Sequence, residues 1–223
     1  MKPFMKAKKW KYKLNDNLDE VEVTEGYQPQ IFITPQASSG GLQQQTSIRV
    51  VENTIFFYGE VNDSTCLDLN AILIDLDAKI WNTFAFIDSA TKPHIKLRIK
   101  SDGGEIFSAL STIDVIRNLK CDVYTYVDGC AASAATLLSI CGKKRFIGKN
   151  GFMLIHQLST ANAGKFKELE DNFENCKAVM KLLKDIYKQY TKINMKALNE
   201  ILDHDLWFDS ATCLSYGLVD EVI

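Results

Sequence analysis

From Thr54 onward, short runs rich in β-branched and aromatic residues alternate with segments whose apolar residues recur every three or four positions. Residues 54–61 and 94–100 are predicted strands, and residues 65–81 between them are a predicted helix. The apolar face of that helix contains Leu67, Leu69, Ile72, Leu73, Leu76 and Ile80. This alternation predicts an α/β domain with parallel strands and crossover connections.

The alternation continues to the C-terminus. Apolar residues at helical spacing predict a helix over residues 105–119, directly after Gly103 and Gly104. The alanine-rich stretch that follows Gly129 is predicted to be the next helix. Strands are also predicted at residues 121–127, 144–148, 151–156 and 218–223, and a short helix at residues 195–202. The second half of the chain therefore extends the same α/β domain.

Residues 163–192 are predicted to form one long helix, because apolar residues recur there every three or four positions. The stripe consists of Phe166, Leu169, Phe173, Cys176, Met180, Leu183, Tyr187 and Tyr190. A stripe of this kind is typical of a buried core face or a subunit interface.

The first fifty residues differ in texture from the rest. They contain a basic start, an acidic patch at residues 16–25 and a polar run at residues 36–47. We therefore expect residues 1–50 to be an N-terminal arm or linker, partly flexible, and residues 51–223 to form one folded domain.

Composition limits the function classes. Hydrophobic residues make up 46% of the 223 residues, enough for a sizeable core, and charged residues 24%. The net charge of -2 gives no general reason to bind nucleic acid, and no apolar run approaches the 18 residues of a membrane span. The six cysteines form no C-x-x-C pair, so neither a metal nor a redox site is expected. A soluble protein in a reducing, cytoplasmic setting is expected.

Two junctions at which a predicted strand meets a predicted helix carry the candidate chemistry, SDGG at residues 101–104 and DGCAAS at residues 128–133. The first N–H groups of a helix have no intrahelical acceptor and lie at the positive end of its dipole. Each junction can therefore stabilise a developing negative charge.

Ser133 lies among alanines that are too small to block a substrate carbonyl, which favours a nucleophile. The alternative is a helix cap, or a small residue that permits tight packing. A nucleophilic serine needs a general base, and the three histidines of the chain are His94, His156 and His204. His156 is the best candidate, because it ends a predicted strand. For the acid that orients the base, composition cannot choose among Asp203, Asp205 and Asp209.

The motifs SDGG, GCAASAA, FMLIHQ and DLWFDSATCLSYGLVDEV occur in this order over residues 52–223. In order and context they resemble those of the Clp protease proteolytic subunit (ClpP) family. The resemblance implies that Ser133 is the nucleophile and His156 the base. It also selects Asp205, which lies two residues before Trp207 and twelve before Gly217.

By the same resemblance, the N–H groups of Gly104 and Ala134 would form the oxyanion hole. The family commonly has proline where this chain has Asp102, but both glycines of the turn are present. The chain departs more strongly at its N-terminus, where a long arm replaces a short segment that forms axial loops.

The resemblance also implies a fold and an assembly. We expect a ClpP/crotonase-like spiral of repeated ββα units, with residues 163–192 as a protruding handle helix. Seven subunits would form each ring, and two rings a homo-oligomeric tetradecamer around a chamber. An AAA+ Clp-type unfoldase would use ATP and deliver protein substrates, while this subunit has no cofactor and no phosphate-binding motif of its own.

The resulting hypothesis is a serine endopeptidase that hydrolyses unfolded proteins and peptides. Two alternatives stay open. One is a catalytically inactive structural subunit, and the other is a crotonase-type acyl-CoA enzyme, which would share the fold and an oxyanion hole without needing all three triad residues.

Overall fold

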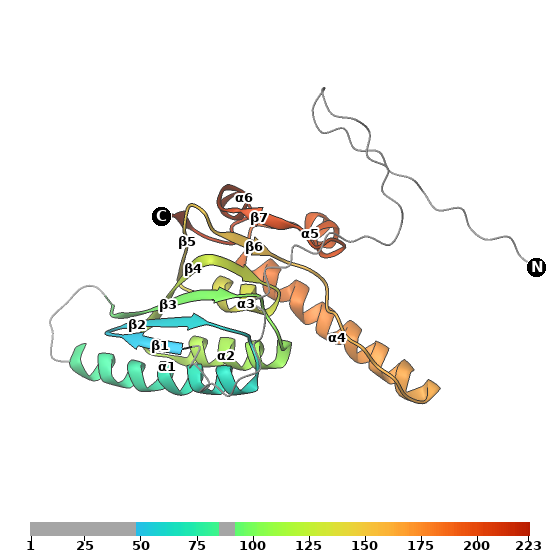
Figure 1. Cartoon of the computed structure of the whole chain (residues 1–223), viewed down its shortest axis with the longest axis horizontal. Helices are drawn as coiled ribbons and strands as arrows, with labels where there is room; N and C mark the ends of the chain where they lie inside the picture. Colours follow the sequence, from blue (N-terminus) through green and yellow to red (C-terminus); the bar gives the residue numbers. More distant parts are fainter. Residues whose placement is uncertain (1–47, 85–91) are drawn as a thin grey trace, which may run out of the picture. The chain divides into compact units, whose positions relative to one another are not determined.

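The computed structural model describes residues 48–84 and 92–223 (Figure 1). The first described element is strand β1 (Ile48–Val51), which pairs antiparallel with β2 (Thr54–Tyr58). Three residues that the sequence pattern assigned to the N-terminal arm, 48–50, thus lie in the sheet. Residues 1–47 of the expected arm are outside the described part of the chain.

One mixed sheet organises the described residues. Its parallel strands follow the order β2, β3, β4, β5 and β8, with β1 antiparallel at one edge. These strands are β3 (His94–Ser101), β4 (Asp122–Ala132), β5 (Lys144–Ile147) and β8 (Glu221–Val222). Strand β6 (Phe152–Leu154) runs parallel to the end of β4, and β7 (Trp207–Asp209) pairs antiparallel with β6. The predicted α/β class with parallel strands is confirmed.

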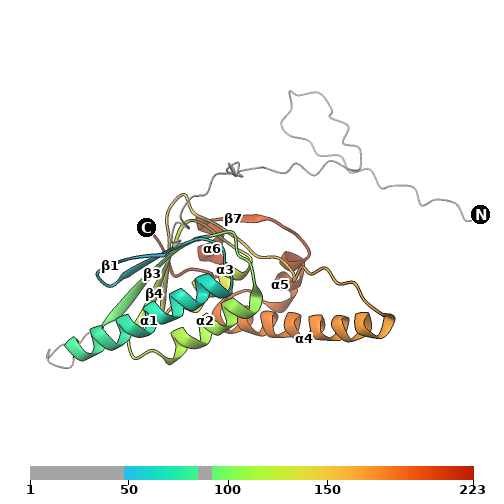
Figure 2. The ribbon, with the colours of Figure 1, turned by 60° about the horizontal axis from the view of Figure 1, so that its bottom comes forward.

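Three helices cover one face of the sheet (Figure 2). They are α1 (Asp63–Phe84), α2 (Ile106–Asn118) and α3 (Ala134–Ile140). Alternate strand residues point toward these helices and are buried, namely Ile55, Phe57, Ile95, Leu97, Ile99, Val123 and Val127. Burial of this continuous apolar layer at about 25 cal/mol per Å² supplies most of the driving force for folding.

The alanine-rich stretch corrects one sequence-based prediction. We expected a helix directly after Gly129, but β4 continues through Ala132 and α3 begins only at Ala134. Ala131 and Ala132 pair with Met153 and Leu154 of β6, so the ladder outweighs the helical preference of alanine. The residues before Ser133 are therefore strand, and Ser133 lies at the junction itself.

The predicted long helix is α4 (Phe166–Tyr190), followed by α5 (Met195–Leu202) and α6 (Ser210–Ser215). In Figures 1 and 2 the first half of α4 extends away from the sheet. Leu183, Ile186 and Tyr187 near its end are buried, whereas Phe166 is 76% and Phe173 62% exposed. The apolar stripe thus serves as core in its second half only.

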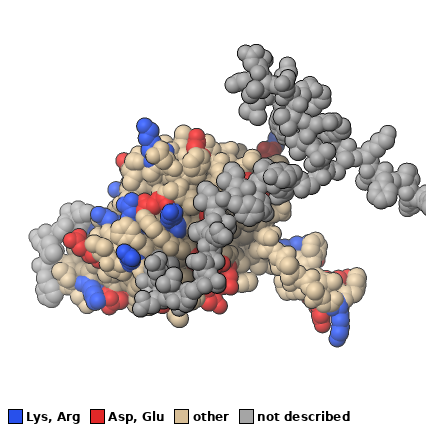
Figure 3. Space-filling view, in the orientation of Figure 1, with Lys and Arg blue, Asp and Glu red and all other residues tan. Residues whose placement is uncertain are grey.

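The surface carries charges of both signs. In the view of Figure 3, acidic and basic side chains are interspersed over the described residues. Within residues 48–84 and 92–223, no helix is both long and apolar enough to span a bilayer. The same residues contain no cluster of three or more His, Cys, Asp or Glu side chains arranged to hold a metal.

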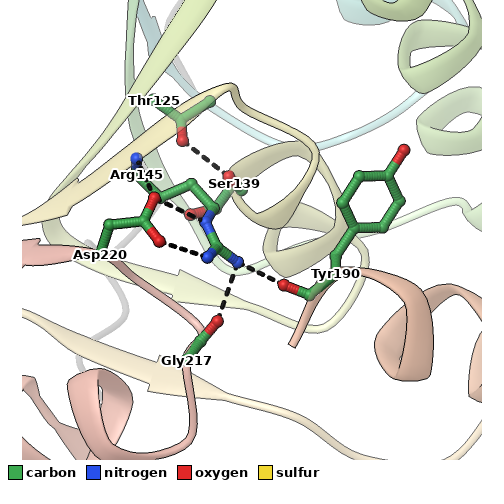
Figure 4. Close-up of polar contacts among 6 residues, drawn as sticks. All are labelled: Thr125, Ser139, Arg145, Tyr190, Gly217 and Asp220. Atoms are coloured by element: carbon green, nitrogen blue, oxygen red, sulfur yellow. Dashed lines mark hydrogen bonds and ion pairs between the residues drawn. The ribbon is translucent and has the colours of Figure 1, made fainter. Parts of the chain in front are cut away.

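Arg145 of β5 ties the end of α4 to the C-terminal segment (Figure 4). Its Nη1 donates to the carbonyls of Tyr190 and Gly217, at 2.5 and 2.8 Å. The rest of the guanidinium binds the Asp220 carboxylate in a two-pronged ion pair, with Nε 3.0 Å from Oδ2. One largely buried cation, with its side chain 13% exposed, thus donates to carbonyls from two segments.

Arg145 holds the pKa of Asp220 below its ordinary value. The stabilisation is therefore present above the pKa of the unfolded chain and is lost as pH falls through the lowered folded value. Asp220→Asn should reduce the melting temperature at neutral pH, by roughly 2–4 °C for each kcal/mol lost. It should also flatten the acid limb of the stability curve, measured by thermal unfolding against pH. Glu221→Gln at the next position is the control, and an equal effect of both variants would contradict this account.

Candidate active site

Ser133 occupies a strained position between β4 and α3. Its φ of 53° and ψ of -127° lie outside the regions that side-chain-bearing residues favour. Its N–H donates to the Leu154 carbonyl at 2.9 Å, which extends the β4–β6 ladder by one residue. Ser133 is the residue before α3, yet its side chain makes no capping hydrogen bond. The hydroxyl therefore does not act as a helix cap.

The Gly103–Gly104 turn packs directly against this junction. Gly103 has a φ of 99°, and a Cβ built on it would lie 2.6 Å from the Ser133 Cβ and 2.7 Å from the Ala132 carbonyl oxygen. Its N–H donates to Ser101 Oγ at 3.1 Å. Only glycine provides both this backbone conformation and this close approach.

Two backbone donors are oriented by these neighbours. Val61 donates to the Gly103 carbonyl at 2.8 Å and accepts from the Glu105 N–H at 2.7 Å. In this parallel bridge the N–H of Gly104 points away from Val61. The N–H of Ala134 has no intrahelical acceptor, because Ala134 is the first residue of α3. The Gly103–Gly104 turn and the start of α3 at Ala134 are therefore adjacent, since a Cβ on Gly103 would lie 3.1 Å from the Ala134 nitrogen.

His156 lies at the same end of the sheet as Ser133, because both residues follow the carboxyl ends of adjacent parallel strands. Ser133 comes directly after β4, and His156 lies two residues after β6. Both residues line one cavity of about 700 Å³, together with Gly104 and Ala134. All four groups therefore face one common cavity.

The β6–β7 ladder brings Asp205 near His156. Leu154 pairs with Trp207, so extending this antiparallel register by two residues places His156 opposite Asp205. His156 Nδ1 and Asp205 Oδ1 are 4.0 Å apart, too far for a hydrogen bond. The His156 side chain is 24% exposed and that of Asp205 81%. The pair is adjacent but not tightly joined in the single chain.

The other candidate residues have different surroundings. Asp209 caps α6 by accepting from the Thr212 N–H at 2.8 Å, and hydrogen bonding to the side chain and the N–H of Thr212 lowers its pKa. Asp203 is the exposed residue that ends α5. His94 stacks on Tyr124 with ring centroids 4.2 Å apart, and burial lowers its pKa. None of these three residues lines the cavity that contains Ser133, and neither does Asp205, so only its position opposite His156 distinguishes Asp205.

Sequence reasoning missed an acidic wall of the cavity. Glu60, Asp63 and Glu105 line it, and Ser108 Oγ lies 2.6 Å from Asp63 Oδ1 and 3.0 Å from Glu105 Oε2. For Glu105 the sequence did contain a signal, because this residue directly follows Gly104, a predicted residue of the site. Glu60 and Asp63 reach the cavity only because the connection from β2 to α1 passes beside it.

A strained serine after a strand, a histidine at the next strand end and two backbone donors on one cavity are the components of a serine-hydrolase site. The family model described as "Clp protease" matches residues 41–223, most of the chain. The chain therefore belongs to the Clp protease proteolytic subunit family.

Three relatives illustrate the similarity. The ATP-dependent Clp protease proteolytic subunit 1 of Streptomyces coelicolor is 30% identical over 186 residues, covering 82% of this chain and 80% of the relative. Subunit 3 of Streptomyces avermitilis is 29% identical over the same shares of both chains. The subunit of Carsonella ruddii is 31% identical over 169 residues, covering 74% of this chain and 87% of its own.

The contact between Gly103 and Ser133 yields a stability test. Gly129 also has a positive φ, 81°, but a Cβ there would meet nothing within 4 Å. Gly129→Ala should therefore cost only backbone strain, about 1 kcal/mol or somewhat more. Gly103→Ala should destabilise the fold further, because it adds overlap with Ser133 and Ala132. Equal free energies of unfolding for the two variants, measured by urea titration, would show that the turn is not packed against the junction.

Proposed function

We propose that this chain is a serine endopeptidase, the proteolytic subunit of an ATP-dependent Clp-type protease that hydrolyses unfolded proteins and peptides. One observation carries the proposal: Ser133 is held at a strained strand-to-helix junction, beside two backbone donors and His156, on one cavity. Membership of the Clp protease family favours this reaction over acyl-CoA chemistry. Neither a cofactor nor a metal is needed for it.

In the proposed mechanism, His156 removes the hydroxyl proton of Ser133 as the oxygen attacks a peptide carbonyl. The N–H groups of Gly104 and Ala134 stabilise the oxyanion of the tetrahedral intermediate. His156 then donates the proton to the leaving amine, and water hydrolyses the acyl-enzyme. Asp205 holds the imidazole in the required tautomer and stabilises its charged form.

The proposed assembly is two heptameric rings that enclose the sites. Support comes from α4, whose first half exposes Phe166, Leu169 and Phe173 in the single chain. Large apolar side chains in such a row are typical of a surface that another protein covers. We propose that α4 is the handle of a ClpP-like spiral fold and joins the rings. An AAA+ unfoldase would supply substrates at the expense of ATP, in the cytoplasm.

Ser133→Ala tests the nucleophile. A triad serine contributes on the order of 10⁶ to kcat, so the variant should lose peptide hydrolysis and covalent labelling by a fluorophosphonate. Ser159→Ala is the matched control, because Ser159 is exposed on the same cavity. Mass spectrometry of labelled peptides identifies the modified residue. Undiminished hydrolysis in Ser133→Ala would refute the assignment.

Asp205→Asn tests the third member of the triad. The amide cannot stabilise the histidine tautomer that catalysis needs, so kcat should fall by about 10⁴. The control is Asp203→Asn, which removes an equal charge two residues away and should leave kcat within twofold. A larger loss in Asp203→Asn than in Asp205→Asn would transfer the role to Asp203.

The separation of His156 and Asp205 favours a second candidate, an inactive structural subunit that assembles with active partners. At 4.0 Å, with Asp205 81% exposed, the pair lacks the hydrogen bond of a working triad. Native mass spectrometry with fluorophosphonate labelling separates the two candidates. Labelled rings are expected for the protease, whereas rings that are neither labelled nor able to cleave a short peptide would identify the structural subunit.

A further inference from the structure

Two buried hydroxyl groups connect α4 to the junction at Ser133. Thr136 Oγ1 of α3 and the Tyr187 hydroxyl of α4 are 2.5 Å apart, although the residues are separated by 51 positions in the chain. Thr136 is fully buried and Tyr187 is 3% exposed. Thr136 Oγ1 also lies 2.6 Å from the Ser133 carbonyl oxygen. The three groups form a continuous hydrogen-bonded chain.

The direction of each hydrogen bond follows from the available protons. The Ser133 carbonyl can only accept, so the single hydroxyl proton of Thr136 is donated to it. Thr136 Oγ1 must then accept from Tyr187, which becomes the terminal donor. Burial raises the pKa of Tyr187 to about 12, so this hydroxyl keeps its proton near neutral pH.

The Ser133 carbonyl, which accepts the hydrogen bond from Thr136, belongs to the same peptide unit as the Ala134 N–H. It also accepts from the Thr136 N–H at 3.0 Å, so two donors from one residue fix its orientation. No cis peptide bond occurs among the described residues, and in a planar trans unit the N–H points opposite to the carbonyl. Fixing the Ser133 carbonyl therefore fixes the direction of the Ala134 N–H.

We propose that Tyr187 acts through Thr136 as a positioning residue for the Ala134 oxyanion donor. The inference rests on the proposed protease function and adds two residues to it, one of them on α4. Tyr187 also lines the wall of the cavity, but in this role it acts through the hydrogen bond of its hydroxyl to Thr136. Donation into the carbonyl also polarises the peptide unit, which strengthens the N–H as a donor.

Tyr187→Phe tests the proposal, because it removes the hydroxyl and keeps the ring that fills the core. An oxyanion donor contributes 10²–10³ in kcat, and a misdirected donor loses part of that. We expect kcat for a short peptide to fall about tenfold while KM changes less than twofold. Tyr190→Phe is the matched control on the same helix, since the Tyr190 hydroxyl accepts from Arg117 instead.

Substitutions at Thr136 test the same hydrogen bonds at their middle member. Thr136→Val keeps the shape and removes the oxygen, so it should reproduce the effect of Tyr187→Phe, and the double variant should be no worse than either single variant. Thr136→Ser keeps the oxygen and should retain kcat within threefold. Additive losses, or equal losses in the serine and valine variants, would overturn the proposal.

Amide hydrogen exchange over residues 133–140 provides a readout that does not need activity. Exchange should be faster in Tyr187→Phe than in Tyr190→Phe or the unmodified protein. If a fluorophosphonate does not modify Ser133 of the unmodified protein, the proposed protease function fails. The exchange comparison still decides whether Tyr187 holds the peptide unit. Wild-type exchange and wild-type kcat in Tyr187→Phe would overturn the inference while leaving the protease function intact.

Discussion

The change of hydrogen-bonding partner along β4 is the constraint on which the site depends. The strand pairs with β5 up to Val127 and with β6 from Cys130 onward. Between Val127 and Ala131, β4 has two more residues than β3 has between their partners Ile99 and Ser101, and Gly129 adopts a positive φ there. Beyond this bulge the ladder resumes, and the buried Ala131 and Ala132 find backbone partners in β6. The ladder then reaches Leu154, and the turn into α3 falls on Ser133.

Backbone pairing therefore places the candidate groups before any side chain contributes. The parallel β4–β6 pair brings Ser133 and His156 to one edge, and the antiparallel β6–β7 pair brings Asp205 opposite His156. Side-chain contacts add less, because Asp205 is largely in solvent and 4.0 Å from the imidazole. In the single chain, the approach of the acid to the base is the least constrained part of the arrangement.

Apolar spacing predicted most elements well, and α5 matches its predicted bounds of residues 195–202. It failed at Ala131 and Ala132, because alanine favours a helix and only a distant strand, β6, holds them extended. The sequence could have shown that Asp209, unlike Asp205, has a structural role. Aspartate is favoured as the residue that caps a helix start, and Asp209 accepts from the N–H three residues later. The Thr136–Tyr187 contact could not be foreseen, because nothing local relates two hydroxyls 51 residues apart.

The positive φ of Ser133 also has an evolutionary consequence. A non-glycine residue in such a conformation destabilises the fold by an amount of order 1–3 kcal/mol, whereas glycine would adopt it freely. Replacing this serine by glycine would therefore stabilise the fold, and only the use of the hydroxyl opposes that replacement. A serine at this point is a residue that the fold tolerates rather than one that it prefers. The position therefore sets a small trade-off between the stability of the domain and the chemistry it can perform.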